Sequence, residues 1–435
     1  MRLVIIGGGA AGMAAASKAK RIKKDMDVLV IEKESFVSYA ECGIPYYLSG
    51  YFDDYKKLLH YPIEEFTEKR GIDIMQNVSV KKIIPSENSV VLDNNKTIGY
   101  DYLVIATGAS AIGHTFGNID QVFTLRTLES AISVKNKMRG KQMCVIGDGV
   151  LGMEIAAELA ESGKEVTIVS KHERLFPKMD EDITRDMIQD FKEKVHVILN
   201  EKVNAIEKEG EKLIVSTNNA KIRCDSAIYA IGIKPNTEFL KDSGIKLDER
   251  GLIISDRNMR TNISNIYAVG DCATSYNRIT GKQDWHPLAQ VANKMGRVAG
   301  SCIGGSVMTF KGALNTTLVK ILGYEVGFTG LDEDECRLNN FKVKSVKLTA
   351  KSRAEYYPGG ERIHLKILYD EDTMKLLGAQ ICGKDGAAWR LNTIETAIYA
   401  GMTTEDLFYN DLGYTPPFGP VWDPIVIGAS LSMRD

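Results

Sequence analysis

The sequence predicts an α/β fold, with two parallel βαβ units followed by an α+β domain at the C-terminal end. An apolar strand at residues 2–6 runs into a glycine cluster and an alanine-rich helix, which is the local pattern of a βαβ unit. The same pattern recurs at residues 142–169. From residue 311 onward, strand-like segments lead to one long helix, so we expect a different kind of domain there.

The N-terminal unit has the features of a dinucleotide site. Gly7, Gly9 and Gly12 fit the pattern G-x-G-x-x-G directly after the first strand, and a second strand at residues 28–31 ends at Glu32. Glycines at these positions let the backbone approach a pyrophosphate at the helix N-terminus, and the acid can bind a ribose hydroxyl. The spacing therefore predicts a Rossmann unit. In the second unit Gly147, Gly149 and Gly152 repeat the pattern and predict a second dinucleotide.

The remaining segments complete this architecture. Buried strands ending in tight turns are predicted within residues 102–108, 226–232 and 266–271, and the last of these brings Asp271 to the carboxyl end of a sheet, where ligands bind. The C-terminal part is predicted to have strands at 343–348, 363–369 and 376–381, a helix at 387–399 and an irregular Pro-rich segment at 413–420. We expect a discontinuous first domain at residues 1–112 and 241–310, a second at 113–240 and a third at 311–435.

The composition excludes several classes of partner. The net charge of the 435 residues is -2, which gives no reason to expect nucleic acid or an anionic membrane. The seven cysteines form no CxxC pair and the six histidines are scattered, so no metal site is expected. The apolar segment 3–16 is too short and too rich in glycine to span a bilayer. We therefore expect a protein of the reducing cytoplasm.

Cys42 differs from the other cysteines in its neighbours. It is followed by Gly43 and by Pro45 near the start of a predicted helix, where backbone N–H groups and the helix dipole stabilise a thiolate. No second cysteine lies nearby, and Tyr47 stands a few residues further on. A redox-active thiol at this position would need a disulfide partner from solution.

The order of these motifs resembles that of the pyridine nucleotide–disulfide oxidoreductase superfamily over essentially the whole chain. The resemblance implies FAD in the first unit, a nicotinamide dinucleotide in the second and a C-terminal dimerisation domain. It implies an FAD site formed by Gly7, Gly9, Ala10, Ala11, Gly12, Glu32, Lys33, Ala106, Thr107, Gly108, Gly270 and Asp271.

With Cys42 alone, the chain is most similar to the single-cysteine branch of that superfamily, and within it to coenzyme A–disulfide reductases. The peroxidases of this branch carry a histidine where this chain has Ala10, so a peroxide would find no general acid there. Tyr356, Tyr357 and Tyr414 look like the tyrosines that reach the other subunit's active site in coenzyme A–disulfide reductases, which implies a homodimer. By the same resemblance, the coenzyme A substrate would contact Lys18, Arg21, Ser38, Asn293 and Arg297.

One residue departs from the motif of this family. The motif is commonly Ser-Phe-x-Asn-Cys, whereas this chain has Ser-Tyr-Ala-Glu-Cys, with Glu41 directly before Cys42. A carboxylate beside a cysteine raises the pKa of the thiol, and it repels an anionic substrate unless it points away.

The second glycine turn is expected to bind NADPH, with NADH as the alternative. Aligning the two units places Ser170 where the first has Glu32, so no acid at that position repels a 2′-phosphate, and Lys171 or Arg174 can pair with it. Glu173, an acid in the same segment, leaves NADH as the alternative cofactor. The predicted site comprises Gly147, Gly149, Val150, Leu151, Gly152, Glu154, Ser170, Lys171 and Arg174, of which Glu154 is placed near the nicotinamide by the resemblance.

The resulting hypothesis is a homodimeric flavoprotein that reduces coenzyme A disulfide with NAD(P)H. A mixed disulfide of Cys42 and coenzyme A would be reduced through FAD, and the freed thiolate would attack the next disulfide. Tyr356, Tyr357 or Tyr414, with Tyr414 favoured, would protonate the departing thiolate. The rival hypotheses are an NADH oxidase in which Cys42 cycles through sulfenic acid, a coenzyme A-persulfide or polysulfide reductase, and a non-enzymatic flavin-bound redox sensor.

Overall fold

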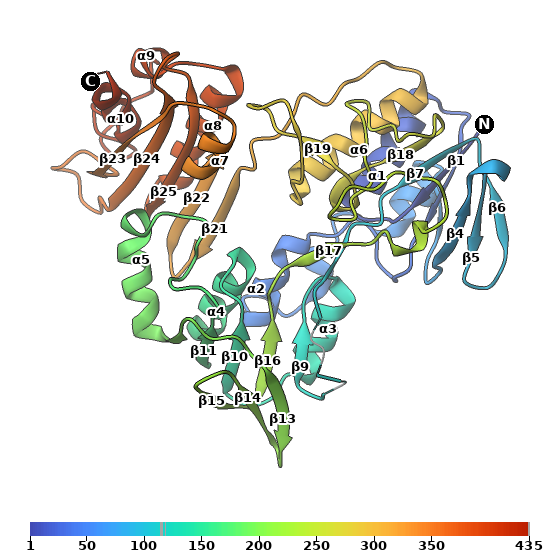
Figure 1. Ribbon diagram of the computed structural model, residues 1–435, viewed down its shortest axis with the longest axis horizontal. Coiled ribbons are helices and arrows are strands. Elements are labelled where there is room, and N and C mark those ends of the chain that lie inside the picture. The colour runs from blue at the N-terminus through green and yellow to red at the C-terminus, as the bar shows by residue number, and fades with distance from the viewer. Residues whose placement is uncertain (114–115, 118, 434–435) are drawn as a thin grey trace.

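The computed structural model describes residues 1–113, 116–117 and 119–433, and its first sheet has five parallel strands in the order β18-β7-β1-β2-β3 (Figure 1). Residues 3–6 of the central strand are buried, which accounts for the unbroken apolar run of the sequence. The strands span Arg2–Ile6 (β1), Asp27–Ile31 (β2), Asp73–Met75 (β3), Tyr102–Ile105 (β7) and Ile266–Ala268 (β18).

Helices α1 (Ala10–Ile22) and α6 (Ala289–Gly304) pack side by side next to this sheet (Figure 1). The face of α6 that meets α1 carries glycines one helical turn apart. A Cβ on Gly296 would lie 2.1 Å from the carbonyl oxygen of Ala11, so the close approach of the two helices requires glycine there.

The second sheet also has five parallel strands, in the order β12-β11-β10-β16-β9. Its strands span Val122–Thr124 (β9), Gln142–Ile146 (β10), Glu165–Val169 (β11), Val195–Ile198 (β12) and Ser226–Tyr229 (β16), and its helices are Leu128–Lys137 (α3), Val150–Glu161 (α4) and Glu181–Lys194 (α5). The chain enters and leaves this unit through β8 (Ala109–Ala111) and β17 (Ile233–Pro235), which pair with each other. The predicted pair of Rossmann-like units is thus confirmed, whereas the exact domain limits stay a prediction.

Small antiparallel sheets extend both units. They are formed by Val80–Ile84 (β4), Ser89–Leu92 (β5) and Thr97–Gly99 (β6), by Ala205–Glu209 (β13), Lys212–Ser216 (β14) and Lys221–Cys224 (β15), and by Ser275–Tyr276 (β19) and Gln283–Asp284 (β20). Among the residues that the structure describes, no helix is long and apolar enough to cross a membrane.

The C-terminal domain is an antiparallel sheet with helices, in the strand order β21-β22-β25-β24-β23. The three predicted strands and the predicted helix are present, but the sequence analysis missed the hairpin of β21 and β22. The elements are Thr317–Ile321 (β21), Tyr324–Gly330 (β22), Val343–Lys351 (β23), Arg362–Asp370 (β24), Leu376–Gly383 (β25), Glu333–Leu338 (α7), Ala387–Ala400 (α8), Thr404–Phe408 (α9) and Pro424–Ser432 (α10).

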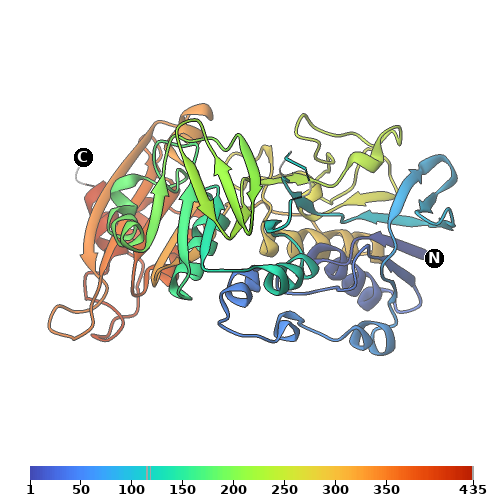
Figure 2. The same cartoon turned by 90° about the horizontal axis from the view of Figure 1, so that it is seen from below.

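An ionic seam joins this domain to the second unit. Helix α5 lies beside the C-terminal strands (Figure 2), and three of its acids, spaced four residues apart on one face, meet basic groups of the sheet. The pairs are Asp182 with Lys347, Asp186 with His364 and Asp190 with Lys384, at 2.7, 3.0 and 3.0 Å. The second unit is therefore held against the C-terminal sheet.

The short helix α2 (Ile44–Ser49) packs into a core that all three parts share. Its buried residues Ile44 and Leu48 belong to the same apolar cluster as Met153 of α4 and Val319 of β21. The segment that carries Cys42 is thereby fixed between the two Rossmann-like units.

Candidate active site

Both glycine turns follow the first strand of their unit and have the same geometry. A Cβ on Gly12 would lie 1.9 Å from the carbonyl oxygen of Gly7, and a Cβ on Gly152 would lie 2.0 Å from that of Gly147. Contacts this short do not occur in folded proteins, so the packing of each turn against its helix requires glycine.

Helices α1 and α4 begin at these turns without a side-chain cap. The N-cap residues are Gly9 and Gly149, which have no side chain to accept a hydrogen bond from the first turn, and neither helix has an acid in that turn. A Cβ on either glycine would meet no atom within 4 Å. Uncapped N–H groups beside open space fit the pyrophosphates of two dinucleotides. The predicted first-turn residues are Ala10 and Ala11 in α1, and Val150 and Leu151 in α4.

Glu32 lies at the end of β2, beside the first glycine turn. Its buried carboxylate accepts hydrogen bonds from the N–H groups of Gly8 and Glu34, at 2.6 and 3.0 Å. The side chain is thus held where a ribose of a dinucleotide would meet it. The neighbouring Lys33 is exposed.

The turns that follow β7 and β18 meet the first glycine turn at the same edge of the sheet. A Cβ on Gly7 would lie 2.2 Å from the carbonyl oxygen of Ala106, and a Cβ on Gly270 would lie 3.0 Å from the Cβ of Ala11. The structure therefore brings together the predicted FAD residues of three separate segments. The further members of these turns are Thr107, Gly108 and Asp271.

Arg126, which the sequence analysis did not single out, connects the cysteine segment with Asp271. Its guanidinium lies 3.1 Å from the carboxylate of Glu41 and 2.7 Å from that of Asp271. Burial raises the pKa of both carboxyls, and the positive charge of Arg126 opposes that rise. Arg126 therefore balances the charge of Glu41, the residue that departs from the family motif. No sequence signal marks this arginine, because its partners are remote along the chain.

Cys42 lies in the turn Glu41–Gly43, directly before α2. It is exposed, whereas the other six cysteines are buried or half-buried. The turn is held against the first glycine turn by Ser38, whose N–H donates to the carbonyl oxygen of Gly8 at 2.9 Å. Ser38 has a φ of 51°, a left-handed conformation that costs a non-glycine residue free energy and is frequent at functional sites.

The surroundings of the thiol do not stabilise its anion. Limited hydration of the thiol in its turn raises the pKa of Cys42, the charges of Glu41 and Glu154 raise this pKa further, and Arg126 lowers it. The prediction of a stabilised thiolate is therefore wrong for the protein groups around Cys42. The sequence analysis could not see that the charge of Glu154, in the second unit, acts on the cysteine.

Glu154 of α4 faces α2, which carries Tyr46. The hydroxyl of Tyr46 donates to the Glu154 carboxylate at 2.9 Å, and one turn further on Ser49 donates to Glu158 at 3.0 Å. Burial raises the pKa of Glu154 to about 7, with the hydrogen bond from Tyr46 lowering it and the charge of Glu158 raising it. Glu154 is thus a carboxyl group that exchanges its proton near neutrality.

The loop after β11 contains the residues predicted to choose between NADPH and NADH. Ser170 is buried and accepts a hydrogen bond from the N–H of His172 at 2.9 Å, and the His172 ring lies 2.9 Å from Asp148 of the glycine turn. Arg174 donates to two backbone carbonyls further along the loop, so its guanidinium is already engaged. Of the two cations considered, Lys171 is the one that the loop leaves exposed.

The predicted coenzyme A contacts lie on the paired helices α1 and α6. Lys18 and Arg21 belong to α1, while Asn293 and Arg297 are exposed on α6. The glycine face of α6 brings the helices together, since a Cβ on Gly300 would lie 3.0 Å from the Cβ of Lys18. The structure thus places these polar groups on one helix pair.

The two tyrosine segments meet in the C-terminal domain. The hydroxyl of Tyr414 is hydrogen-bonded to Tyr356, which raises the pKa of Tyr414, and both rings are exposed. Tyr357 follows in the same β23–β24 loop. In Figure 1 this end of the domain lies at the far left, while α2 lies at the centre. Within one chain, the structure does not bring these tyrosines to Cys42.

Comparison with known proteins identifies the family. Residues 1–296 match the family model described as pyridine nucleotide-disulphide oxidoreductase, and residues 316–424 match the dimerisation domain of the same family. The chain belongs to the pyridine nucleotide-disulphide oxidoreductase family. It is therefore an oxidoreductase and a flavoprotein, and the family implies FAD and NAD(P)H as its cofactors. The presence of the dimerisation domain supports a homodimer.

Several members of this family are similar over nearly the whole chain. An NAD(P)H sulfur oxidoreductase (CoA-dependent) from Pyrococcus abyssi is 40% identical over 98% of this chain and 96% of its own length. A coenzyme A disulfide reductase from Staphylococcus aureus is 31% identical over 96% of both chains. The solved structure of an NAD-dependent persulfide reductase from A. fulgidus is similar with a TM-score of 0.94 and 31% identity, covering 100% of this chain and 83% of that one.

Proposed function

We propose that this flavoprotein uses NAD(P)H to reduce coenzyme A disulfide through Cys42, with a Cys42–coenzyme A mixed disulfide as the intermediate. The observation that carries the proposal is the position of the exposed Cys42 between the two units. Its neighbour Glu41 is joined through Arg126 to Asp271 of the first unit. The helix that follows it donates from Tyr46 to Glu154 of the second. A thiol between two dinucleotide turns can receive electrons from a bound dinucleotide and can exchange with a disulfide that arrives from solution. The similarity to the coenzyme A disulfide reductase of Staphylococcus aureus supports the choice of substrate.

The first unit would hold FAD and the second NAD(P)H. The open side of Gly9 and the uncapped N-terminus of α1 suit the FAD pyrophosphate, and Glu32 suits a ribose. Bound FAD would supply two-electron transfer between the nicotinamide and the sulfur. Lys171 and the absence of an acid at Ser170 favour NADPH, with NADH as the alternative.

Cys42 would act as the nucleophile. Its thiolate attacks one sulfur of coenzyme A disulfide, the S–S bond breaks, and one coenzyme A thiolate leaves and takes up a proton. The mixed disulfide that forms on Cys42 then accepts two electrons, which releases the second coenzyme A and restores the Cys42 thiolate. The guanidinium of Arg126, paired with Glu41, reduces the repulsion of anionic substrate by that carboxylate.

The hydroxyl that protonates the leaving thiolate would come from the partner subunit. Tyr356 and Tyr414 form an exposed hydrogen-bonded pair in the domain that matches the family's dimerisation domain. The β23–β24 loop, which carries Tyr356, lies at the far edge of the C-terminal domain from α2 (Figure 1), so we expect these hydroxyls to act at the thiol across a dimer. The basic helix pair with Lys18 and Arg297 would contact the coenzyme A phosphates.

A second candidate is reduction of coenzyme A persulfide or polysulfide. The name of the Pyrococcus abyssi relative, 40% identical, favours it, and the same Cys42 chemistry serves it. Intact mass under non-reducing conditions tests both. We expect an adduct of coenzyme A mass, removed by dithiothreitol and absent from Cys42→Ser. Turnover of polysulfide with no turnover of coenzyme A disulfide would select the second candidate.

A further inference from the structure

We propose that Asp148 supplies the carboxylate that binds the adenosine ribose in the second unit, as Glu32 would in the first. The proposal rests on the proposed function, because the second unit then has to bind NAD(P)H. The hydroxyl that Asp148 binds is the 3′-hydroxyl, which NADH and NADPH share.

The two units have the same backbone arrangement at this place. The N–H of the first glycine of each turn donates to the last residue of the next strand, at 2.9 Å in both units. The residue that follows this strand is Glu32 in the first unit and Ser170 in the second, and its N–H donates to the last residue of the adjoining strand at 2.8 Å in both. The second residue of the turn is Gly8 in the first unit and Asp148 in the second. The acid is thus at the strand end in one unit and in the turn in the other.

In the first unit, the acid at the strand end fills the space beside the turn. The Glu32 carboxylate accepts a hydrogen bond from the N–H of Gly8 at 2.6 Å. A Cβ on Gly8 would lie 3.3 Å from that carboxylate and 2.6 Å from the side chain of Val37. A side chain at this position of the turn therefore points toward the carboxylate site, and it has no room there while Glu32 and Val37 occupy the space.

In the second unit, the small Ser170 leaves this space to Asp148. The Asp148 side chain is buried, and its Oδ1 lies 2.9 Å from Nδ1 of His172. The same ring nitrogen lies 3.5 Å from the hydroxyl of Ser170, which accepts a hydrogen bond from the N–H of His172 at 2.9 Å. The carboxylate of Asp148 thus lies near Ser170, where the first unit has the carboxylate of Glu32.

One oxygen of this carboxylate lacks a partner. In the part of the chain that the structure describes, no group forms a hydrogen bond with the buried Oδ2 of Asp148. Buried carboxylate oxygens are normally hydrogen-bonded, because burial without a partner costs free energy. A ribose hydroxyl is a donor that satisfies this oxygen. The side chain of His172, which contacts the carboxylate, is 40% exposed, so it can turn toward solvent and admit the ribose.

The position of Asp148 in the turn selects the hydroxyl. The glycine turn is the part of the unit that a pyrophosphate approaches. Along the bonds of the ribose, the 3′-carbon is nearer to the 5′-phosphate than the 2′-carbon is. A carboxylate on the turn therefore meets the 3′-hydroxyl, whereas the exposed Lys171 beyond the strand meets the 2′-position. Asp148 thus adds affinity for both dinucleotides, and Lys171 keeps its proposed contact with a 2′-phosphate.

Calorimetric titration of the flavin-loaded enzyme tests this assignment. NAD⁺, NADP⁺ and 3′-deoxy-NAD⁺ are titrated into the wild type and into Asp148→Gly, which has the residue of the first unit at this position. Loss of a charge-assisted hydrogen bond should raise the Kd for NAD⁺ and for NADP⁺ equally, by about ten- to hundredfold. The substitution should not weaken the binding of 3′-deoxy-NAD⁺. Unchanged NAD⁺ affinity, or weaker NAD⁺ binding together with tighter NADP⁺ binding, overturns the proposal.

Returning the acid to the strand end should restore the binding of NAD⁺. The double variant Asp148→Gly, Ser170→Glu has the arrangement of the first unit. It should bind NAD⁺ about tenfold more tightly than Asp148→Gly does, but it should not regain NADP⁺ affinity, because an acid at the strand end opposes a 2′-phosphate. A double variant that retains FAD and binds NAD⁺ no better than Asp148→Gly contradicts the assignment.

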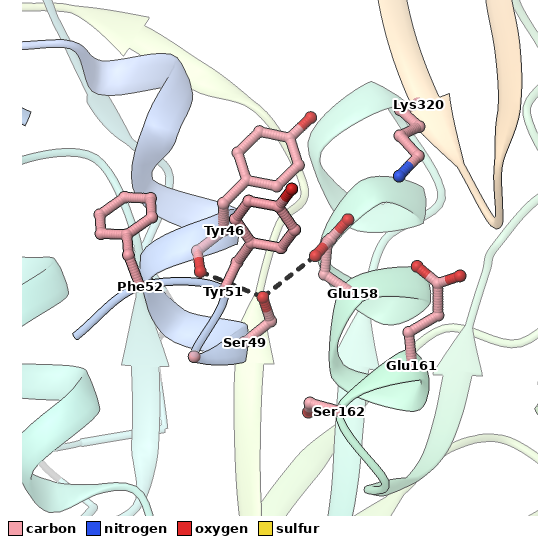
Figure 3. Close-up of a pocket in the computed structure, with 9 residues that line it drawn as sticks. Tyr46, Ser49, Tyr51, Phe52, Glu158, Glu161, Ser162 and Lys320 are labelled. Atoms are coloured by element: carbon pink, nitrogen blue, oxygen red, sulfur yellow. Dashed lines mark hydrogen bonds between the residues drawn. The ribbon is translucent and has the colours of Figure 1, made fainter.

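Two further variants separate ribose binding from folding and from general charge. Asp148→Asn keeps the volume of the side chain, and it should also weaken NAD⁺ and NADP⁺ equally, by about tenfold. Glu161→Gln removes a carboxylate at the opposite end of α4, beside the cavity of about 550 Å³ that Figure 3 shows, and should bind all three dinucleotides like the wild type. An equal loss of affinity in Glu161→Gln would show that general charge is measured, and it would refute the ribose contact. Absence of coenzyme A disulfide turnover in a wild-type enzyme with the expected dinucleotide affinities would refute the proposed function and leave the role of Asp148 intact.

Discussion

Gly149→Ala should weaken the binding of a dinucleotide to the second unit without destabilising the fold of that unit. Gly149 has φ −70° and ψ −178°, which alanine adopts without strain, and its Cβ would meet no protein atom within 4 Å. The substitution reduces the freedom of the unfolded chain, so the free energy of unfolding should stay equal or rise by up to about 1 kcal/mol. The new methyl group lies where the backbone approaches a pyrophosphate.

The matched variant Gly152→Ala should destabilise the fold of the second unit. Its Cβ would lie 2.0 Å from the carbonyl oxygen of Gly147, so the backbone has to shift by roughly 1 Å, at an expected cost of about 1–3 kcal/mol.

For Gly149→Ala, loss of one charge-assisted N–H contact to phosphate, worth roughly 1.5–3 kcal/mol, weakens NADPH affinity about ten- to hundredfold.

Calorimetry and thermal unfolding of the two flavin-loaded variants measure these effects. We expect Gly149→Ala to retain its FAD absorbance and its melting temperature while its Kd for NADP⁺ rises, and Gly152→Ala to melt at a lower temperature. Unchanged NADP⁺ affinity in a folded Gly149→Ala protein would show that the pyrophosphate does not bind at the start of α4.

The remaining predictions concern the thiol, the cofactor and the dimer. Cys42→Ser should keep FAD and lose disulfide turnover, because serine forms no mixed disulfide; residual turnover above a few per cent of the wild type would refute the role of the thiol. Glu41→Gln should lower the pKa of Cys42 and speed its alkylation, by up to about tenfold, below that pKa, and a slower reaction would contradict the charge argument. Lys171→Glu should weaken NADPH binding about ten- to hundredfold and spare NADH; equal NADPH kinetics would exclude Lys171. Tyr414→Phe should slow disulfide reduction but not hydride transfer, and mixing with Cys42→Ser subunits should restore activity unless Tyr414 serves its own chain.

The elements that follow local rules were predicted correctly. The strand Arg2–Ile6, the glycine turn after it and helix α1 depend on neighbours along the chain, so the sequence alone indicates them. The hairpin of β21 and β22 was missed. Strand β21 alternates buried and exposed residues in Thr-Leu-Val-Lys-Ile, but the run is short. It is stabilised by pairing with β22, which in turn pairs with β25 from a distant part of the sequence.

The candidate site shows the same division. The glycine turns, Glu32, Cys42 and the tyrosine segments were found from motifs, because each motif is contiguous and its chemistry is local. The rise in the pKa of Cys42 caused by Glu41, its neighbour in sequence, was predicted. Arg126 and the charge of Glu154 were missed, because both approach from the second unit.

The sequence by itself determined that this chain has two glycine turns of the dinucleotide-binding type, and it set Cys42 apart from the other cysteines by its neighbours, since glycine spacing and residue type are properties of the chain. Only the tertiary structure decided that Arg126 balances Glu41 and that Tyr46, beside the cysteine segment, donates to Glu154 of the second unit. The physical reason is that charge and burial act through space. The pKa of a thiol or carboxyl depends on the groups within a few ångströms of it, and the packing of α2 against α4 brings those groups together from segments far apart in the sequence.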